Sequence, residues 1–432
     1  MKPINTIKSI FTTLIVLGII QSTIAQDNGK SQTFPSLKFF ASGQIWLRHT
    51  QLNPGSTIDN INETNVTDIS IRRFRMGMYG DLSDRWFVKL QFGVNNTNYV
   101  TNNSNLKILD LLAIYKVNNW LNIGFGKNGY TGPSRYASVG SSSMLGVDIP
   151  IFALSTVGIT DDLIRKFSVF IKGDLGKLNY RIVLAKPKKV AIPLPTDKTD
   201  FKIGNPNIQP SAYFKYQFKE AETTKSAFTP GTYFGTKKII TLGAGFLYQK
   251  DAMWNISDVD TTQYSMFQFA TDLLIDYPLN SDNTRSITIY AAYFNTNFGD
   301  NYLRSIGVNN PANGSSRSML TGTGNAYPCI GTGQVYYLQL GYRFAFDQDK
   351  YLIKALVPYF NVQYADYQKL DQTMILYESG INLLMNGHRS KLTLGVQNRP
   401  IYMTNGDDQI VIDERKYMFV LQYQFKLSKK VM

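Results

Sequence analysis

Residues 86–94 read Trp-Phe-Val-Lys-Leu-Gln-Phe-Gly-Val, and they carry the clearest secondary-structure signal in the chain. Large apolar side chains stand at every second position, and Lys89, Gln91 and Gly93 stand between them. Successive side chains of a β-strand point to opposite faces, so the pattern predicts a strand with one apolar and one polar face. The same period of two returns in segments of roughly ten residues from Leu37 to the C-terminus. The chain is therefore expected to be all-β.

Alternation of this kind occurs in soluble β-sandwiches, which bury one face in a core, and in membrane barrels, which turn it to lipid. Two observations favour the barrel. Tyr, Phe and Trp recur at the ends of the segments on the apolar face, as in the aromatic girdles of membrane interfaces. Only 18% of the 432 residues are charged, yet a mean hydropathy of -0.18 is too polar for a bundle of membrane helices. A soluble, exported double sandwich stays as the alternative fold.

Counting the segments predicts a transmembrane antiparallel β-barrel of about 16 strands, an even number that closes without free edges. The expected strands lie near 37–51, 67–80, 85–94, 106–117, 120–129, 165–173, 177–186, 208–218, 237–249, 264–277, 286–298, 335–346, 355–366, 373–385, 389–398 and 417–425. Long connections at 52–66, 95–105, 130–164, 187–207, 250–263, 299–334 and 399–416 alternate with short turns, so both termini fall at the short-turn end. The connection 218–236 is the exception, because it is long where a short turn is expected.

The N-terminus has the pattern of an export signal. Lys2 and Lys8 precede an apolar run over 10–20, and Thr23-Ile24-Ala25 offers a small-x-small cleavage site. The run is too short for a membrane anchor, since a spanning helix needs about 20 residues. We therefore expect a signal peptide at 1–25, a short periplasmic segment at 26–36, the barrel at 37–425 and a basic periplasmic tail at 426–432. The expected location is the bacterial outer membrane.

The connection 130–164, which we call the constriction loop, is the longest segment without strand character. A loop of that length in a compact domain is usually functional or disordered. Its apolar residues indicate that it folds against other parts of the chain: Met144, Leu145, Val147, Ile149, Ile151 and Phe152. We expect it to enter the lumen after the fifth strand and to constrict the pore. An exterior loop packed on the rim is the alternative.

Strand parity predicts which charged side chains line the lumen, provided that the apolar face of each strand meets lipid. The inward cations are Arg73, Arg75, Lys89, Lys166, Lys172, Arg181, Lys215, Arg343 and Lys391. The inward anions are Asp110, Asp272 and Glu378, with Asp276 at a rim. An excess of cations on a channel wall raises the local concentration of anions and repels cations. The alternative is that single cations pair with wall carboxylates, or hold the constriction loop through Asp148, Asp161 and Asp162.

The stretch 69–82, Ile-Ser-Ile-Arg-Arg-Phe-Arg-Met-Gly-Met-Tyr-Gly-Asp-Leu, followed by 86–92, resembles the opening hairpin of the phosphate-selective porin O/P family. Residues 109–127 and 165–181 resemble the next hairpins of Bacteroidetes-type members, so that the resemblance covers about 65–190. It implies a homotrimeric porin of about 16 strands whose third long loop constricts the pore. The charged residues that match the family pattern are Arg72, Arg73, Arg75, Lys89 and Asp110.

The leading functional hypothesis is an outer-membrane porin for passive diffusion of small hydrophilic solutes, with an anion preference, phosphate among the candidates, set by inward Arg and Lys. The alternative is a barrel that acts as a surface glycan-binding protein or adhesin. We expect no enzyme activity, cofactor or metal, because 1 Cys and 2 His leave little material for such sites. The expected partners are outer-membrane lipid, small anions or polar solutes, further copies in a homotrimer, and the barrel assembly machinery, which reads the last strand; nucleic acid is not expected.

Overall fold

The computed structural model describes residues 34–101, 105–188, 196–202, 204–223, 225–256, 260–317, 320–346 and 350–431. Sixteen strands form the wall of a barrel: β1 (Ser36–Gln51), β4 (Asn65–Asp81), β5 (Trp86–Thr97), β6 (Lys107–Lys116), β7 (Asn122–Asn128), β8 (Lys166–Leu175), β9 (Leu178–Lys186), β11 (Gln209–Gln217), β12 (Ile239–Ile256), β13 (Thr261–Pro278), β14 (Arg285–Asn297), β18 (Gly333–Ala345), β19 (Ala355–Tyr367), β20 (Met374–Leu384), β21 (Ser390–Thr404) and β22 (Ile410–Lys430). Each corresponds to one expected strand, so the predicted barrel is confirmed.

Shorter elements lie in the connections between these strands. They are β2 (Ser56–Ile58), β3 (Ile61–Asn62), β10 (Asp200–Phe201), β15 (Leu303–Ile306), β16 (Gly314–Ser315) and β17 (Tyr327–Gly331), and the 3₁₀ turns η1 (Tyr136–Ser138), η2 (Ser141–Ser143) and η3 (Ile151–Leu154). Of the short strands, β10 joins the barrel sheet by pairing with the far end of β12. No helix among the described residues is long and apolar enough to span a membrane.

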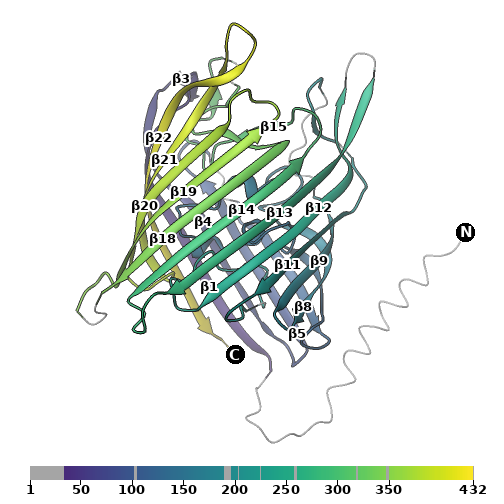
Figure 1. The fold of residues 1–432 in the computed structure, drawn as a ribbon, viewed down its shortest axis with the longest axis vertical. Coiled ribbons are helices and arrows are strands. Elements are labelled where there is room, and N and C mark those ends of the chain that lie inside the picture. The colour runs from purple at the N-terminus through teal and green to yellow at the C-terminus, as the bar shows by residue number, and fades with distance from the viewer. Residues whose placement is uncertain are drawn as a thin grey trace, which may run out of the picture.

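The wall closes on itself, because β1 pairs antiparallel with both β4 and β22. The ladder between β1 and β22 runs from Thr50↔Met418 to Lys38↔Lys430. Closure gives the backbone N–H and C=O groups of the first and last strands the partners that lipid cannot supply. Figure 1 shows the tilted strands of the wall, with the C-terminus at the end opposite β3 and β15.

The predictions of two long loops are wrong. β12 runs to Ile256 and β13 begins at Thr261, so most of the expected loop 250–263 is strand. In the same way, β21 runs to Thr404 and β22 begins at Ile410, within the expected loop 399–416. Register shifts in both hairpins, between Gln249 and Met253 and between Ile401 and Tyr402, interrupt the period of two while the backbone pairing continues.

The C-terminal strand is also longer than the sequence predicts. Residues 426–430, expected as a basic periplasmic tail, pair with residues 38–42 of β1. The apolar alternation stops near Leu427, although the backbone ladder goes on past it. The expected signal peptide 1–25 and residues 26–33 lie outside the described residues.

The outer face of the wall is apolar. Leu111, Val169 and Leu184 are each more than half exposed, and aromatic and aliphatic side chains fill most neighbouring outward positions. A continuous apolar surface of this size would drive aggregation in water, whereas lipid tails solvate it. The outer face therefore has the character of a lipid-exposed surface.

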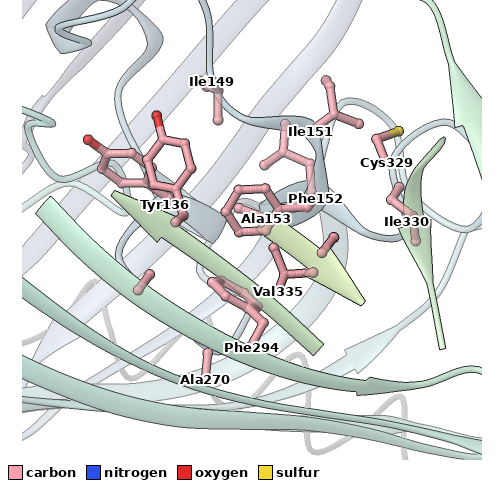
Figure 2. Close-up of a cluster of buried hydrophobic side chains, with 14 of the residues drawn as sticks. Tyr136, Ile149, Ile151, Phe152, Ala153, Ala270, Phe294, Cys329, Ile330 and Val335 are labelled. Carbon is pink, nitrogen blue, oxygen red and sulfur yellow. The ribbon is translucent and has the colours of Figure 1, made fainter. Parts of the chain in front are cut away.

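Inside the wall, much of the lumen is filled by the chain itself. The constriction loop enters the barrel, as predicted, and its Tyr136, Ile149 and Phe152 lie in a buried apolar cluster with wall residues. Figure 2 shows Phe152 beside Phe294 of β14 and Val335 of β18, and the Phe152 and Phe294 ring centroids are 5.0 Å apart in an edge-to-face arrangement. The connection from β14 to β18 adds Cys329 and Ile330 of β17 to the same cluster.

Candidate functional site

The inner face of the barrel carries the charged side chains that parity selects. The cations are Arg73 and Arg75 of β4, Lys89 of β5, Lys166 and Lys172 of β8, Arg181 of β9, Lys215 of β11, Arg343 of β18 and Lys391 of β21. The acids are Asp110 of β6, Asp272 of β13 and Glu378 of β20, with Asp276 towards the short-turn end of β13. Most of these side chains are buried, because connections folded into the lumen cover them.

Strand β4 departs from simple parity at its arginines. Its register against β1 shifts between Gln44 and Ile45, so that Arg73 lies opposite Gln44 and Ile71 lies opposite Ile45. Arg72 is the extra residue of this β-bulge, and both Arg72 and Arg73 are buried on the inner side while Ile71 is exposed. Without the bulge one of the two arginines would face lipid, which costs about 2–4 kcal/mol at the bilayer midplane.

Arg72 and Arg73 hold the tip of the constriction loop through one carboxylate. Asp148 accepts hydrogen bonds from Arg72 Nε at 2.6 Å and from Arg73 Nη2 at 2.5 Å. The Arg72 guanidinium also lies over the Trp46 ring, 5.5 Å from its centroid. Bonds between a carboxylate and a guanidinium are charge-assisted and stronger than neutral hydrogen bonds. The loop tip is therefore fixed to β4.

A second ion cluster holds the C-terminal end of the loop. The buried Asp110 lies 3.0 Å from Lys89 Nζ and 3.4 Å from Arg165 Nε. Two further pairs lie nearby, Lys127–Asp162 at 2.8 Å and Lys166–Asp161 at 3.8 Å. Asp161 and Asp162 connect the constriction loop to β7 and β8, and Arg165, directly after the loop, binds Asp110 of β6.

The acids of the facing wall anchor backbone groups of the loop. Glu378 Oε1 accepts hydrogen bonds from the Val147 N–H and the Tyr359 hydroxyl, both at 2.9 Å. Asp272 Oδ2 accepts one from the Arg135 N–H at 2.7 Å. Buried carboxylates need such donors, and buried N–H groups need such acceptors. The constriction loop is thus tied to β13 and β20 as well as to β4.

A buried ion cluster joins the constriction loop to the connection between β11 and β12. Glu222 accepts hydrogen bonds from Lys215 Nζ at 2.6 Å and from Arg135 Nη1 at 2.9 Å, and Arg135 Nη2 also bonds to it. These three side chains are at most 4% exposed. Burial alone would raise the pKa of the Glu222 carboxyl, but Arg135 and Lys215 outweigh it and hold that pKa well below its usual value.

Four lumen cations bond uncharged oxygens instead of carboxylates. Arg75 donates to the carbonyl of Val94 at 2.7 Å, Arg181 to that of Ser134 at 3.0 Å, Lys391 to that of Met144 at 2.7 Å, and Arg399 to the Asn53 side-chain oxygen at 3.2 Å. Within the described residues none of these four cations forms an ion pair. Their positive charge is therefore not neutralised at short range.

A small cavity with a mainly apolar lining and a few polar side chains lies beside the tip of the constriction loop. It measures about 50 Å³ and lies between residues 147–151 and the inner face of β19, β20 and β21. Among its lining side chains, Asn325, Asn361 and Gln363 are at most 4% exposed and carry amide atoms without a hydrogen-bond partner in the described chain. A cavity of this size has room for a few water molecules. No group of three His, Cys, Asp or Glu side chains in the described residues is arranged to hold a metal ion.

Parity missed several inward charges. Arg48 and Asp68 form a two-point pair with both N···O distances at 2.8 Å, and the alternation of β1 could have placed Arg48 on the polar face. Arg72 needed the bulge, for which two adjacent arginines in a membrane strand are a signal. Arg135 and Glu222 lie in connections, where no periodicity sets the direction of a side chain.

The chain is similar to solved outer-membrane porins. OmpT of Vibrio cholerae in its trimer form is 9% identical, over 90% of this chain and 99% of that chain, with a TM-score of 0.46. An anion-selective porin from Comamonas acidovorans is 9% identical, over 91% and 99%, with a TM-score of 0.48. Pseudomonas putida OprB is 11% identical, over 91% and 93%, with a TM-score of 0.49. No curated protein sequence matches the chain.

The family model of phosphate-selective porin O and P matches residues 41–131. The matched part covers most of β1, all of β4 to β7, and the start of the constriction loop. It includes the Arg-Arg-x-Arg strand and the Lys89 strand on which the resemblance rests, so the predicted family is confirmed there. Over these strands the chain is similar to the phosphate-selective porin O and P family, and its fold is a closed antiparallel β-barrel.

Proposed function

We propose that this porin passes small hydrophilic solutes by passive diffusion and that it prefers anions. The observation that carries the preference is the group of lumen cations that bond uncharged oxygens: Arg75, Arg181, Lys391 and Arg399. They come from β21, β4 and β9, so they are spread along one half of the wall instead of forming one patch.

Charge that is not neutralised locally leaves a positive potential in the lumen. The barrel wall and the surrounding lipid have a low dielectric constant, which focuses the field into the water path. An anion that enters is stabilised and a cation is repelled. Arginine also holds oxyanions at two points, so phosphate and carboxylates are candidate solutes beside chloride.

The predicted lumen residues divide into two proposed roles. Arg75, Lys172, Arg181, Arg343 and Lys391 attract anions. Arg73, Lys89, Lys166 and Lys215, which bond carboxylates, position the inward-folded connections, and Asp110, Asp272 and Glu378 are their counterparts on the wall. On this assignment the residues that bond carboxylates set the width of the path, and Arg75, Arg181, Arg343 and Lys391, which bond uncharged oxygens, set its charge preference.

We extend the proposal to the assembly. The apolar outer face fits outer-membrane lipid, and the family resemblance implies a homotrimer. The last strand, with outward Tyr417, Phe419 and Tyr423, is the segment that we propose the barrel assembly machinery reads.

The test is the reversal potential of the purified protein in a planar bilayer under a KCl gradient. We expect a sign that indicates anion preference. The double variant Arg75→Gln/Arg181→Gln removes two of these cations. It should lower the anion-to-cation permeability ratio several-fold, because the positive potential in the lumen falls. The variant Arg285→Gln, which removes an exposed cation at the end of a strand, is the matched control and should leave the ratio unchanged.

Each possible result bears on a different part of the proposal. Absence of conductance in the wild-type protein would rule out the channel. A reversal potential of the opposite sign would rule out only the anion preference. An equal effect of the control variant would mean that total charge, and not lumen charge, determines the preference.

A further inference from the structure

The connection between β11 and β12 folds into the barrel from the short-turn end. We call it the inner connection; it is described over residues 218–223 and 225–238. The neighbouring connections at this end, 176–177 and 279–284, are tight turns that stay at the rim. The extra length of the inner connection, which the alternation of turns leaves unexplained, therefore has a place inside the lumen.

The inner connection touches the constriction loop through backbone groups. Val139 and Thr229 form a parallel β-bridge. The Gly140 N–H donates to the Thr229 carbonyl at 2.8 Å, and the Thr229 N–H donates to the Ser138 carbonyl at 3.1 Å. Two segments that enter the barrel from opposite ends thus meet inside it.

Phe228 of the inner connection packs against a part of the wall that is distant from β11 and β12. The Phe228 ring lies under two cations, with Lys89 Nζ 4.9 Å and the Arg165 guanidinium carbon 4.5 Å from its centroid. Lys89 belongs to β5, which is five strands away from β11 around the wall. Cation–π contacts of this kind stabilise by about 0.5–2 kcal/mol each, depending on how far water is excluded.

Its other end is bound to the opposite half of the wall. Asp276 Oδ2 accepts hydrogen bonds from Thr232 Oγ1 at 2.7 Å and from the Tyr233 N–H at 2.9 Å. The Thr232 carbonyl bonds His388 Nε2, in the turn between β20 and β21, at 2.8 Å. Together with the Phe228 contacts, these bonds carry the inner connection across the lumen.

The carboxylate of Glu222 in the inner connection neutralises part of the positive charge inside the lumen. Glu222 occupies the bonding groups of both Lys215 and Arg135, which are at most 2% exposed. Without Glu222, Lys215 and Arg135 would have no carboxylate partner here, as is the case for Arg75, Arg181, Lys391 and Arg399. The inner connection therefore reduces both the width of the lumen and the positive charge that a solute would meet.

We propose that the inner connection is a second constriction, and that anion passage requires it to withdraw from Arg135, Lys215 and the constriction loop. Withdrawal widens the path and uncovers two more cations, so size limit and anion preference change together. This inference rests on the proposed channel function and identifies the segment that regulates it.

The test is a reversible lock between the two segments. The variant Val139→Cys/Thr229→Cys, in a Cys329→Ser background, places two thiols on neighbouring positions of the β-bridge, where a disulfide can form. We expect conductance in the planar bilayer to be lost on oxidation and regained when the same protein is reduced. Each single-cysteine variant under the same oxidant is the control and should conduct throughout.

A second variant tests the ionic anchor. Glu222→Gln keeps the shape of the side chain but frees Arg135 and Lys215 from their counter-charge, so we expect a higher conductance and a higher anion-to-cation permeability ratio. An unchanged ratio and conductance would overturn the role of Glu222.

The lock also separates this inference from the channel proposal. Full cross-linking with unchanged conductance, or thiols that do not cross-link at all, would overturn the inference and leave the porin function standing. If wild type, the reduced lock and Glu222→Gln all fail to conduct, the channel proposal itself is wrong.

Discussion

At the scale of single residues, the lumen charges act mainly through their partners. Parity alone treats Arg73 and Arg75 as equivalent, yet Arg73 bonds Asp148 of the constriction loop while Arg75 bonds backbone carbonyls of β4 and β5. A cation with a carboxylate partner adds little field, whereas one bonded to carbonyls keeps its charge. On the proposed function, the neighbourhood of each cation decides whether it attracts solutes or positions a loop.

Removing the Asp148 charge tests this distinction. In Asp148→Asn, Arg72 and Arg73 lose their shared counter-charge, and breaking a buried pair on one side costs about 3–5 kcal/mol. We expect a looser loop tip, seen as faster hydrogen exchange over 146–150, and a reversal potential shifted towards anions. The exposed Asp413→Asn is the control. An unchanged reversal potential would mean that Asp148 does not screen the lumen cations.

We expect the attachment of the inner connection to depend on pH through His388. It lies outside the membrane-spanning strands, in the turn between β20 and β21, and its ring stacks on Phe234 with centroids 4.3 Å apart. Burial, with smaller contributions from Lys391 and Lys426, lowers the pKa of His388 from its ordinary value of 6.5 to about 3. The folded state therefore favours the neutral imidazole.

The sign follows from this lowered pKa. The contribution of neutral His388 to the stability of the folded state is complete above pH 6.5. It is lost as the pH falls towards 3, by about 1.4 kcal/mol per pH unit. We expect amide exchange over 232–235, corrected for its intrinsic pH dependence, to be faster at pH 5 than at pH 7.5. His388→Phe keeps the stacking but cannot titrate, so the difference should vanish. A difference that persists in the variant would assign the pH dependence to another group.

At the scale of elements, each wall strand separates a lipid face from a lumen face residue by residue. On β21, Leu394 is 45% exposed on the outer face, whereas Gln397 lines the inner cavity near the constriction loop. The same strand must therefore tolerate a charge at one of these positions and reject it at the other.

A matched pair of lysine substitutions tests this asymmetry. Leu394→Lys should lose about 2–4 kcal/mol of stability, because a lysine near the bilayer midplane faces lipid. Gln397→Lys should assemble normally and shift selectivity further towards anions. The measurement is the folded fraction in vesicles by heat-modified gel mobility. Equal stability of the two variants would contradict the assignment of the outer face to lipid.

At the scale of the whole molecule, the barrel combines a lipid-facing wall with a lumen occupied from both ends. If the porin is a homotrimer, as the family resemblance implies, one inserted particle contains three separate lumens. We expect conductance to appear and close in groups of three equal steps, and the detergent-solubilised particle to have about three times the protein mass of the chain by light scattering. Single steps from a particle of monomer mass would refute the trimer.

The sequence alone was sufficient to predict the strands of the barrel wall. A period of two with aromatic ends specifies sixteen strands and the face that each side chain takes, because in a strand the direction of a side chain is a local property. It was not sufficient where the period is interrupted, as at Arg72, Ile256 and the C-terminal end of β22.

Tertiary structure decided what fills the lumen. The partners of Lys215 and Arg73 lie in connections that are distant in sequence, and no local pattern orients Glu222, Asp148 or Phe228. Their positions depend on closure of the barrel, which brings segments from opposite ends into one confined space. Local alternation therefore determined which residues point inward, and only the folded chain determined which of their charges remain for a solute.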